Sequence, residues 1–279
     1  MIDLHTHSTA SDGRCTPREL VARAAAAGVR TLGLTDHDTV AGCAEAQTAC
    51  GEAGLQFVSG IEVTTVMGRS ELPKDVHVLG YFVETGAAAF LAFLAEQRER
   101  RLDRVREMVE RLASLGIALD LDAILRPGLQ DTGKAAGRPW IARALVEGGY
   151  VASAREAFDR WLSRGCPAYV PRVGPSPADA FARIHAAGGL VSLAHPGLTA
   201  IDPQIPELVA AGLDAIEVYH SKHDWVATRR YLAMAGEFNL LVTGGSDFHG
   251  ESSHGPAAPG SVVLPREAFD RLQARAQAR

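Results

Sequence analysis

Residues 1–8 read MIDLHTHS, and their alternation of apolar and polar side chains predicts a β-strand. Side chains two apart in a strand point to the same face, so His5 and His7 present two imidazoles side by side. The turn-rich stretch TASDG follows at residues 9–13 and carries the carboxylate of Asp12. Two imidazoles with a nearby carboxylate are typical of the start of a metal site. A polar strand end with hydrated histidines explains this segment equally well, so the rest of the chain must decide.

Length and composition indicate a globular chain. Its 279 residues allow one large α/β domain or a barrel with an insertion, and a hydrophobic content of 47% provides a sizeable core. A net charge of −5 argues against broad binding to duplex DNA. The cysteines lack paired spacing, which indicates reduced thiols, and because strand material starts at residue 2 we expect no signal peptide. The longest apolar run, residues 87–95, is too short for a membrane span. We therefore expect a cytoplasmic protein without membrane association.

Strand and helix patterns alternate in the first third of the chain. Helices are predicted at residues 17–28 and 39–53, and strands at 31–35, 56–66 and 76–83. This alternation is typical of parallel β/α units.

The pattern changes at residues 90–115, which predict one long amphipathic helix. Its many arginines suggest a nucleic-acid-binding face. However, Glu96–Arg100 and Glu107–Arg111 have the i,i+4 spacing of ion pairs on one helix, so a solvent-facing surface is favoured. Further helices are predicted at residues 139–147 and 153–164.

These helices predict two structural parts. Residues 99–169 form an all-helical insertion that covers the mouth of the site, and residues 1–98 and 170–279 form one discontinuous catalytic barrel. Strand and helix alternate again after the insertion. Helices are predicted at 177–187, 203–211 and 223–238, and strands at 190–194, 214–219, 240–243 and 261–264. The total of about seven or eight β/α units is that of a closed barrel.

The predicted strand ends carry an unusual set of side chains, because parallel barrel strands bring their C-terminal ends to one mouth. The set comprises His5, His7, His37, Glu62, His77, His195, Asp247 and His249, with Asp12 on the first loop. Six histidines and three carboxylates at successive strand ends are hard to explain as separate structural residues. Nitrogen and oxygen ligands without thiolate suit zinc, manganese or iron.

Five blocks of sequence resemble the PHP (polymerase and histidinol phosphatase) metallohydrolases. They are DLHTHS at 3–8, TDHD at 35–38, GIE at 60–62, AHP at 194–196 and GSDFH at 245–249. The resemblance implies a distorted (β/α)7 barrel of the α/β class with two or three divalent metal ions, manganese being favoured and zinc or iron the alternatives. It also implies the ligand sets: His5, His7, Glu62 and Asp247 for one ion, Glu62 with His77 and His195 for a second, and Asp12, His37 and His249 for a third.

The insertion resembles that of one branch of the family. Enzymes of that branch remove the 3′-phosphate of nucleoside 3′,5′-bisphosphates, such as adenosine 3′,5′-bisphosphate to AMP and phosphate, and trim short RNA from its 5′ end. The marker is Gly137-Arg138-Pro139, which follows the loop Asp131 to Gly137. Trp140 stands where many relatives are expected to have a histidine, a departure that concerns the neighbouring pocket and not the metal ligands.

Other residues have expected roles in phosphate-ester hydrolysis. We expect Arg138 to hold the non-reacting phosphate through bidentate hydrogen bonds, with Lys222 and Ser8 as further substrate-binding candidates. His220 and His223 are candidate general acids, and either could be a hydrogen-bonding structural residue instead.

Asp36 and Glu217 are expected to orient the metal ligands from behind. The leading prediction is a metal-dependent phosphatase that acts on nucleotides or short RNA, with no obligatory protein partner. Histidinol-phosphate phosphatase, another phosphomonoesterase, and an amidohydrolase or deacetylase with the same site are alternatives. A metal-binding regulatory module without catalysis is disfavoured, because no expected ligand is missing.

Overall fold

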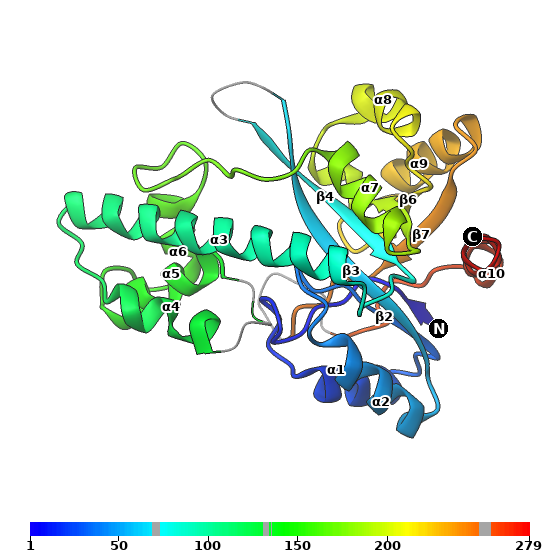
Figure 1. Ribbon diagram of the computed structural model, residues 1–279, viewed down its shortest axis with the longest axis horizontal. Coiled ribbons are helices and arrows are strands. Elements are labelled where there is room, and N and C mark those ends of the chain that lie inside the picture. Colours follow the sequence, from blue (N-terminus) through cyan, green and yellow to red (C-terminus); the bar gives the residue numbers. More distant parts are fainter. Residues whose placement is uncertain (69–72, 131–133, 135, 251–257) are drawn as a thin grey trace.

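The computed structural model describes residues 1–68, 73–130, 134, 136–250 and 258–279. Within these residues, seven strands form one sheet in sequence order (Figure 1). The strands are β1 (Ile2–Asp3), β2 (Thr31–Leu34), β3 (Gln56–Met67), β4 (Lys74–Tyr81), β5 (Leu190–Leu193), β6 (Ala215–His220) and β7 (Leu241–Gly245). The first and last strands meet where the Leu4 N–H donates to the Gly244 carbonyl at 3.3 Å. The sheet therefore closes almost completely, and the expected distorted barrel is confirmed.

The distortion lies at β4, which runs antiparallel to both β3 and β5. The expectation of parallel strands is wrong here. Only six residues separate the end of β3 from the start of β4, and a parallel pair needs a longer crossover connection. The strand expected at residues 261–264 is also absent, although the Leu264 N–H donates to the Ile2 carbonyl and its side chain is buried in the core.

Six helices lie around the barrel and cover its apolar side chains. They are α1 (Pro17–Ala26), α2 (Cys43–Ala53), α7 (Pro177–Ala186), α8 (Ile205–Ala210), α9 (Trp225–Glu237) and α10 (Arg266–Gln277). Both α1 and α7 begin with a capping box, in which Thr16 and Ser176 accept a hydrogen bond from the third helical N–H. Their starts are thus fixed by local sequence.

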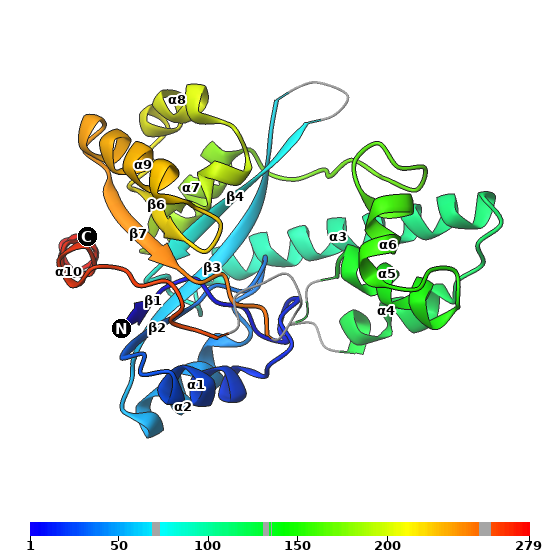
Figure 2. The same cartoon turned by 180° about the vertical axis from the view of Figure 1, so that it is seen from behind.

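The remaining helices project to one side of the barrel (Figures 1 and 2). They are α3 (Ala88–Ser114), α4 (Leu121–Gln130), α5 (Arg138–Glu147) and α6 (Ala154–Ala157), which continues into a π-helical turn at Phe158–Leu162. The sequence did not predict α4, whose interior contains Pro127, a residue that disfavours helix. The loop expected at Asp131 to Gly137 lies partly outside the described residues, which omit 131–133 and 135.

Helix α3 belongs to two hydrophobic clusters. Phe90, Phe93 and Leu94 pack in the barrel core, whereas Leu102 and the apolar residues after it pack in a second cluster with α4, α5 and α6. This separation supports the proposed division between a barrel and a helical insertion. In the described part of the chain, no helix is both long and apolar enough to cross a membrane.

Candidate metal centre

The N-terminal segment carries its two histidines into the barrel interior because it runs between β2 and the segment after β7. The His7 N–H donates to the Phe248 carbonyl at 2.9 Å, and the Asp247 N–H donates to the His5 carbonyl at 2.8 Å. Thr6 points away and donates its hydroxyl to the Gly33 carbonyl at 2.6 Å. Alternation along the strand therefore places His5 and His7 on one face, and their ring centroids lie 5.1 Å apart.

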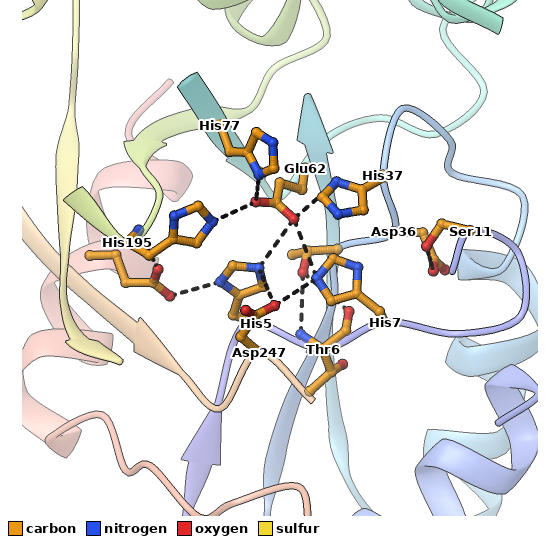
Figure 3. Close-up of polar contacts among 12 residues, drawn as sticks. His5, Thr6, His7, Ser11, Asp36, His37, Glu62, His77, His195 and Asp247 are labelled. Atoms are coloured by element: carbon orange, nitrogen blue, oxygen red, sulfur yellow. Dashed lines mark hydrogen bonds and ion pairs between the residues drawn. The ribbon is translucent and has the colours of Figure 1, made fainter. Parts of the chain in front are cut away.

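Glu62, from β3, is the central carboxylate of the cluster (Figure 3). Its Oε2 lies 3.3 Å from the Nε2 atoms of His5 and His7 and 3.2 Å from Nδ1 of His37. Its Oε1 lies 2.7 Å from Nδ1 of His77 and 3.0 Å from Nε2 of His195. Burial alone would raise the pKa of Glu62, but the surrounding histidines hold it well below its ordinary value.

The position of His77 depends on the direction of β4. His77 is the fourth of the eight residues of β4 and lies opposite Thr64 in the antiparallel ladder. A parallel β4 would change which residue of β3 lies opposite His77. The antiparallel strand instead brings it to the same mouth as the strand ends, within 2.7 Å of Glu62.

Asp247 closes the cluster from the β7 side. Its Oδ1 lies 3.3 Å from Nε2 of His5 and 3.1 Å from Nε2 of His7. The backbone there is held by Asp3, a fully buried carboxylate that accepts hydrogen bonds from the N–H and hydroxyl of Ser246. Gly245 is required beside it, because a Cβ at this position would lie 2.3 Å from the His5 nitrogen.

The first loop contributes Asp12, which faces a second group of histidines. Its carboxylate lies 3.3 Å from Nε2 of His249, 3.8 Å from Nε2 of His37 and 4.0 Å from Nδ1 of His7. Burial alone would lower the pKa of His249, but Asp12 raises it to about 10. Burial lowers the pKa of His37 to about 3, so its ring is neutral and its nitrogens can act as ligands.

The cluster fits divalent cations on two observations. Both ring nitrogens of His7, and Nδ1 of His37 and of His195, are buried without a hydrogen-bond partner. Such orphaned nitrogens are costly unless something binds them. In addition, ligand atoms of His5, His7, Glu62 and Asp247 lie within 4.8 Å of one another, as do those of three further His/Asp/Glu groups that share some of these residues. The donors are imidazole nitrogens and carboxylate oxygens, which suit manganese, iron or zinc.

Two buried carboxylates, Glu217 and Asp36, accept hydrogen bonds from the ligand candidates or from the loop that carries them. Glu217 accepts from Nδ1 of His5 at 2.9 Å and from the His195 N–H at 2.7 Å, which leaves Nε2 of His5 facing the cluster. Asp36 accepts from the Ser8 N–H and from the hydroxyls of Ser8 and Ser11, and thereby holds the loop that carries Asp12. These contacts support the orienting roles expected for both residues.

The hydrogen bonds of Ser8 and His223 argue against their expected roles. Ser8 is fully buried, its hydroxyl donates to Asp36, and its oxygen accepts from the Ala10 N–H, so it does not face a substrate. In His223, Nδ1 donates to the Val218 carbonyl and Nε2 accepts from the Gly197 N–H at 3.2 Å. With both ring nitrogens occupied, His223 is a structural link between the loops after β5 and β6.

His220, the other candidate acid, is hydrogen-bonded to the cluster. Its Nδ1 accepts from the Lys222 N–H at 3.1 Å, so the ring proton lies on Nε2, which is 3.3 Å from Oδ2 of Asp247. The Lys222 side chain is exposed in the adjoining loop.

Four arginines gather where the insertion meets the barrel: Arg101, Arg104, Arg138 and Arg172, here called the arginine cluster. Burial and the nearby Arg138 lower the pKa of Arg104 to about 10, while burial, Arg101 and Arg104 lower that of Arg172 to about 9. Nη2 of Arg104 is buried without a hydrogen-bond partner. Arg101, Arg104 and Arg172 line a pocket with Asp38, the residue after His37.

The sequence identified only Arg138 of this cluster. The expected ion pairs of α3 are present, with Arg100 2.5 Å from Glu96 and Arg111 2.8 Å from Glu107. Arg101 and Arg104, on the same helix, point inward instead. Their helical phase was a usable signal, because Arg101 and Arg104 lie four residues before Val105 and Met108, which are buried.

Comparisons with known proteins support the site. A model of the PHP domain matches residues 3–131. A curated relative from Chromobacterium violaceum, named 3′,5′-nucleoside bisphosphate phosphatase, is 36% identical over 282 residues, which is 98% of this chain and 97% of the relative. The chain belongs to the PHP family.

Two further relatives are also named for phosphoester chemistry. The 5′–3′ exoribonuclease Rnm of Escherichia coli is 36% identical and aligns with 88% of this chain and 84% of its own. A solved structure from Bifidobacterium adolescentis, described as a putative metal-dependent phosphoesterase, has a TM-score of 0.86 at 33% identity and covers 98% of this chain and 95% of its own. This PHP protein is therefore a metal-dependent hydrolase of phosphoester bonds.

Proposed function

We propose that this PHP enzyme removes the 3′-phosphate of nucleoside 3′,5′-bisphosphates and also accepts 5′-phosphorylated short RNA. The observation that carries the proposal is the arginine cluster beside the candidate metal centre. Asp38 lines the arginine pocket and directly follows His37, so the two sites adjoin. A substrate with two phosphates matches two neighbouring sites that each favour anions.

The proposed ligand sets follow the contacts around Glu62. One ion would be held by His5, His7, Glu62 and Asp247, a second by Glu62, His77 and His195, and a third by Asp12, His37 and His249. Bound there, divalent metal ions lower the pKa of water and neutralise phosphate charge.

The protein side chains would position the substrate and the metal ligands. The guanidinium of Arg138 lies over the Phe158 ring at 5.6 Å, and its Nη1 donates to the Leu162 carbonyl at 3.5 Å, which restricts its orientation. Its other N–H donors would bind the phosphate. His220 would donate a hydrogen bond from Nε2, which lies 3.3 Å from Oδ2 of Asp247, and would thereby orient that carboxylate. The departing ribose oxygen would take its proton from water.

The test compares phosphate release from a bisphosphate, from a simple monophosphate ester and from histidinol phosphate, with manganese and then with chelator. In the Arg138→Ala variant, we expect kcat/KM for the bisphosphate to fall about 10- to 100-fold, the usual effect of losing hydrogen bonds to a charged group. The value for the monophosphate ester should stay nearly constant. Arg143→Ala, an exposed position on the same helix, is the matched control.

Three outcomes would contradict the proposal. An equal loss on both substrates would refute the role of Arg138. Faster release from histidinol phosphate than from any nucleotide would replace the proposed substrate. Hydrolysis of an acetylated amine without phosphate release would favour an amidohydrolase.

A further inference from the structure

An exposed tryptophan lies at the rim of the candidate metal centre. Trp225 is 67% exposed, whereas Trp140 and Trp161 pack against the second hydrophobic cluster in the insertion. Trp225 is the first residue of α9 and directly follows the loop that leaves β6 at His220.

Trp225 lies near the candidate metal centre in the chain and in space. The ring of His220, which lies 3.3 Å from Asp247, has its centroid 5.4 Å from that of the His223 ring. Trp225 follows His223 by two residues, so their Cα atoms lie within about 7 Å. Trp225 is the first residue of α9 and helical side chains tilt toward the N-terminal end, so the indole lies at the end of α9 that follows the loop from His220.

The rim around the indole is cationic and held in place. The guanidinium of Arg229 lies 5.7 Å from the Trp225 ring, and the Lys222 side chain is exposed in the preceding loop. The carboxylate of Asp224 caps α9 by accepting from the Ala227 N–H at 2.8 Å. The hydrogen bond from the Gly197 N–H to His223 fixes this loop against the loop after β5.

An aromatic ring with arginine and lysine beside a phosphate-binding centre is the usual composition of a platform for nucleotide bases. We propose that Trp225, flanked by Arg229, stacks on the base of a nucleotide whose phosphate lies at the metal centre. The inference rests on the proposed nucleotide substrate and adds the group that holds its base. Stacking engages the face of every base, so the platform gives affinity with little base preference.

Binding measurements test the platform without catalysis. The dissociation constants of AMP and of ribose 5-phosphate, which lacks the base, are measured by equilibrium dialysis with the metal-loaded protein. For Trp225→Ala, we expect AMP to bind about tenfold more weakly, at the lower end of the effect of losing one base–aromatic stack, and ribose 5-phosphate to bind as before. Trp225→Phe should restore most of the affinity, and Val226→Ala, an adjacent side chain that is 45% exposed, is the control.

The possible outcomes distinguish a base-stacking role of Trp225 from a contact with a second copy of the chain. Equal affinity of Trp225→Ala and the unchanged protein for AMP overturns the platform. Loss of a dimer in sedimentation on Trp225→Ala overturns it as well, because the indole would then contact a second copy of the chain. If AMP binding depends on Trp225 but no nucleotide releases phosphate, the platform stands and the proposed function fails.

Discussion

Glu217 shows how one buried side chain determines the arrangement of several others. Its two oxygens accept from Nδ1 of His5 and from the His195 N–H, groups that lie 190 positions apart in the chain. The contact to His5 fixes which nitrogen carries the proton, and the contact to His195 holds a backbone with a φ of +27°. A left-handed backbone at a non-glycine residue is strained and persists only where its surroundings hold it.

We predict that Glu217→Gln weakens metal binding. A glutamine presents N–H donors on one side, so it cannot accept from both His5 and His195 as the carboxylate does. The affinity for manganese should fall about 10- to 100-fold, the usual effect of removing an outer contact of a ligating histidine. Competition with a metal-sensitive dye measures the affinity for manganese. The variant Glu237→Gln, at an exposed position, is the control. An unchanged affinity would show that Glu217 does not orient the ligands.

At the scale of elements, α3 joins the insertion to the metal-bearing loops through one arginine. Nε of Arg101 lies 2.6 Å from Oδ2 of Asp38, Nη1 donates to the Ala136 carbonyl at 3.0 Å, and Nη2 donates to Thr64 at 3.1 Å. The helix thus contacts the loop after β2, strand β3 and the segment before α5. These part-buried contacts hold Arg101 beside Asp38, the residue after His37.

We predict that Asp38→Asn destabilises the chelator-treated protein by about 3–5 kcal/mol, because it leaves Arg101 buried without its counter-charge. Burial alone would raise the pKa of Asp38, but Arg101 and Arg172 lower it below its ordinary value. The stabilisation is therefore fully present above about pH 4, the ordinary pKa of aspartate, and is lost as the pH falls through the lowered folded-state pKa.

Urea unfolding measures the difference in free energy of unfolding between the unchanged protein and the Asp38→Asn variant. It should be equal at pH 7 and pH 5 and should shrink only below about pH 4. Asp270→Asn, which removes an exposed ion pair with Arg266, should change stability by less than about 0.5 kcal/mol. A difference that already shrinks between pH 7 and pH 5 would contradict the assignment to Asp38.

At the scale of the whole molecule, the metal centre joins distant parts of the chain. Its ligands come from the N-terminal segment, the loops after β2, β5 and β7, and the interiors of β3 and β4. Cations bound there would connect nearly every strand of the barrel. Metal binding is therefore expected to be coupled to global stability.

We predict that removal of metal with a chelator lowers the unfolding temperature and abolishes phosphate release, and that added manganese restores both. A ligand that binds only the folded state adds about 2.7 kcal/mol at a concentration 100 times its Kd. Calorimetry across a manganese series should show a steadily rising Tm, whereas magnesium at the same ionic strength controls for salt. A Tm that does not respond to either chelator or manganese would contradict a structural contribution from metal.

The sequence by itself determined the alternation of strands and helices and the residue types of the candidate centre. Local spacing carries this information, because side chains alternate along a strand and helix starts depend on nearby capping residues. His5, His7 and Glu62 could therefore be identified as candidates before their neighbours in space were known. Only the tertiary structure decided the direction of β4, which brings His77 to the mouth, and the partners Asp38 and Val170 that Arg101 and Arg104 bind. These features depend on strand pairing and burial against residues far away in sequence, which a local pattern does not encode.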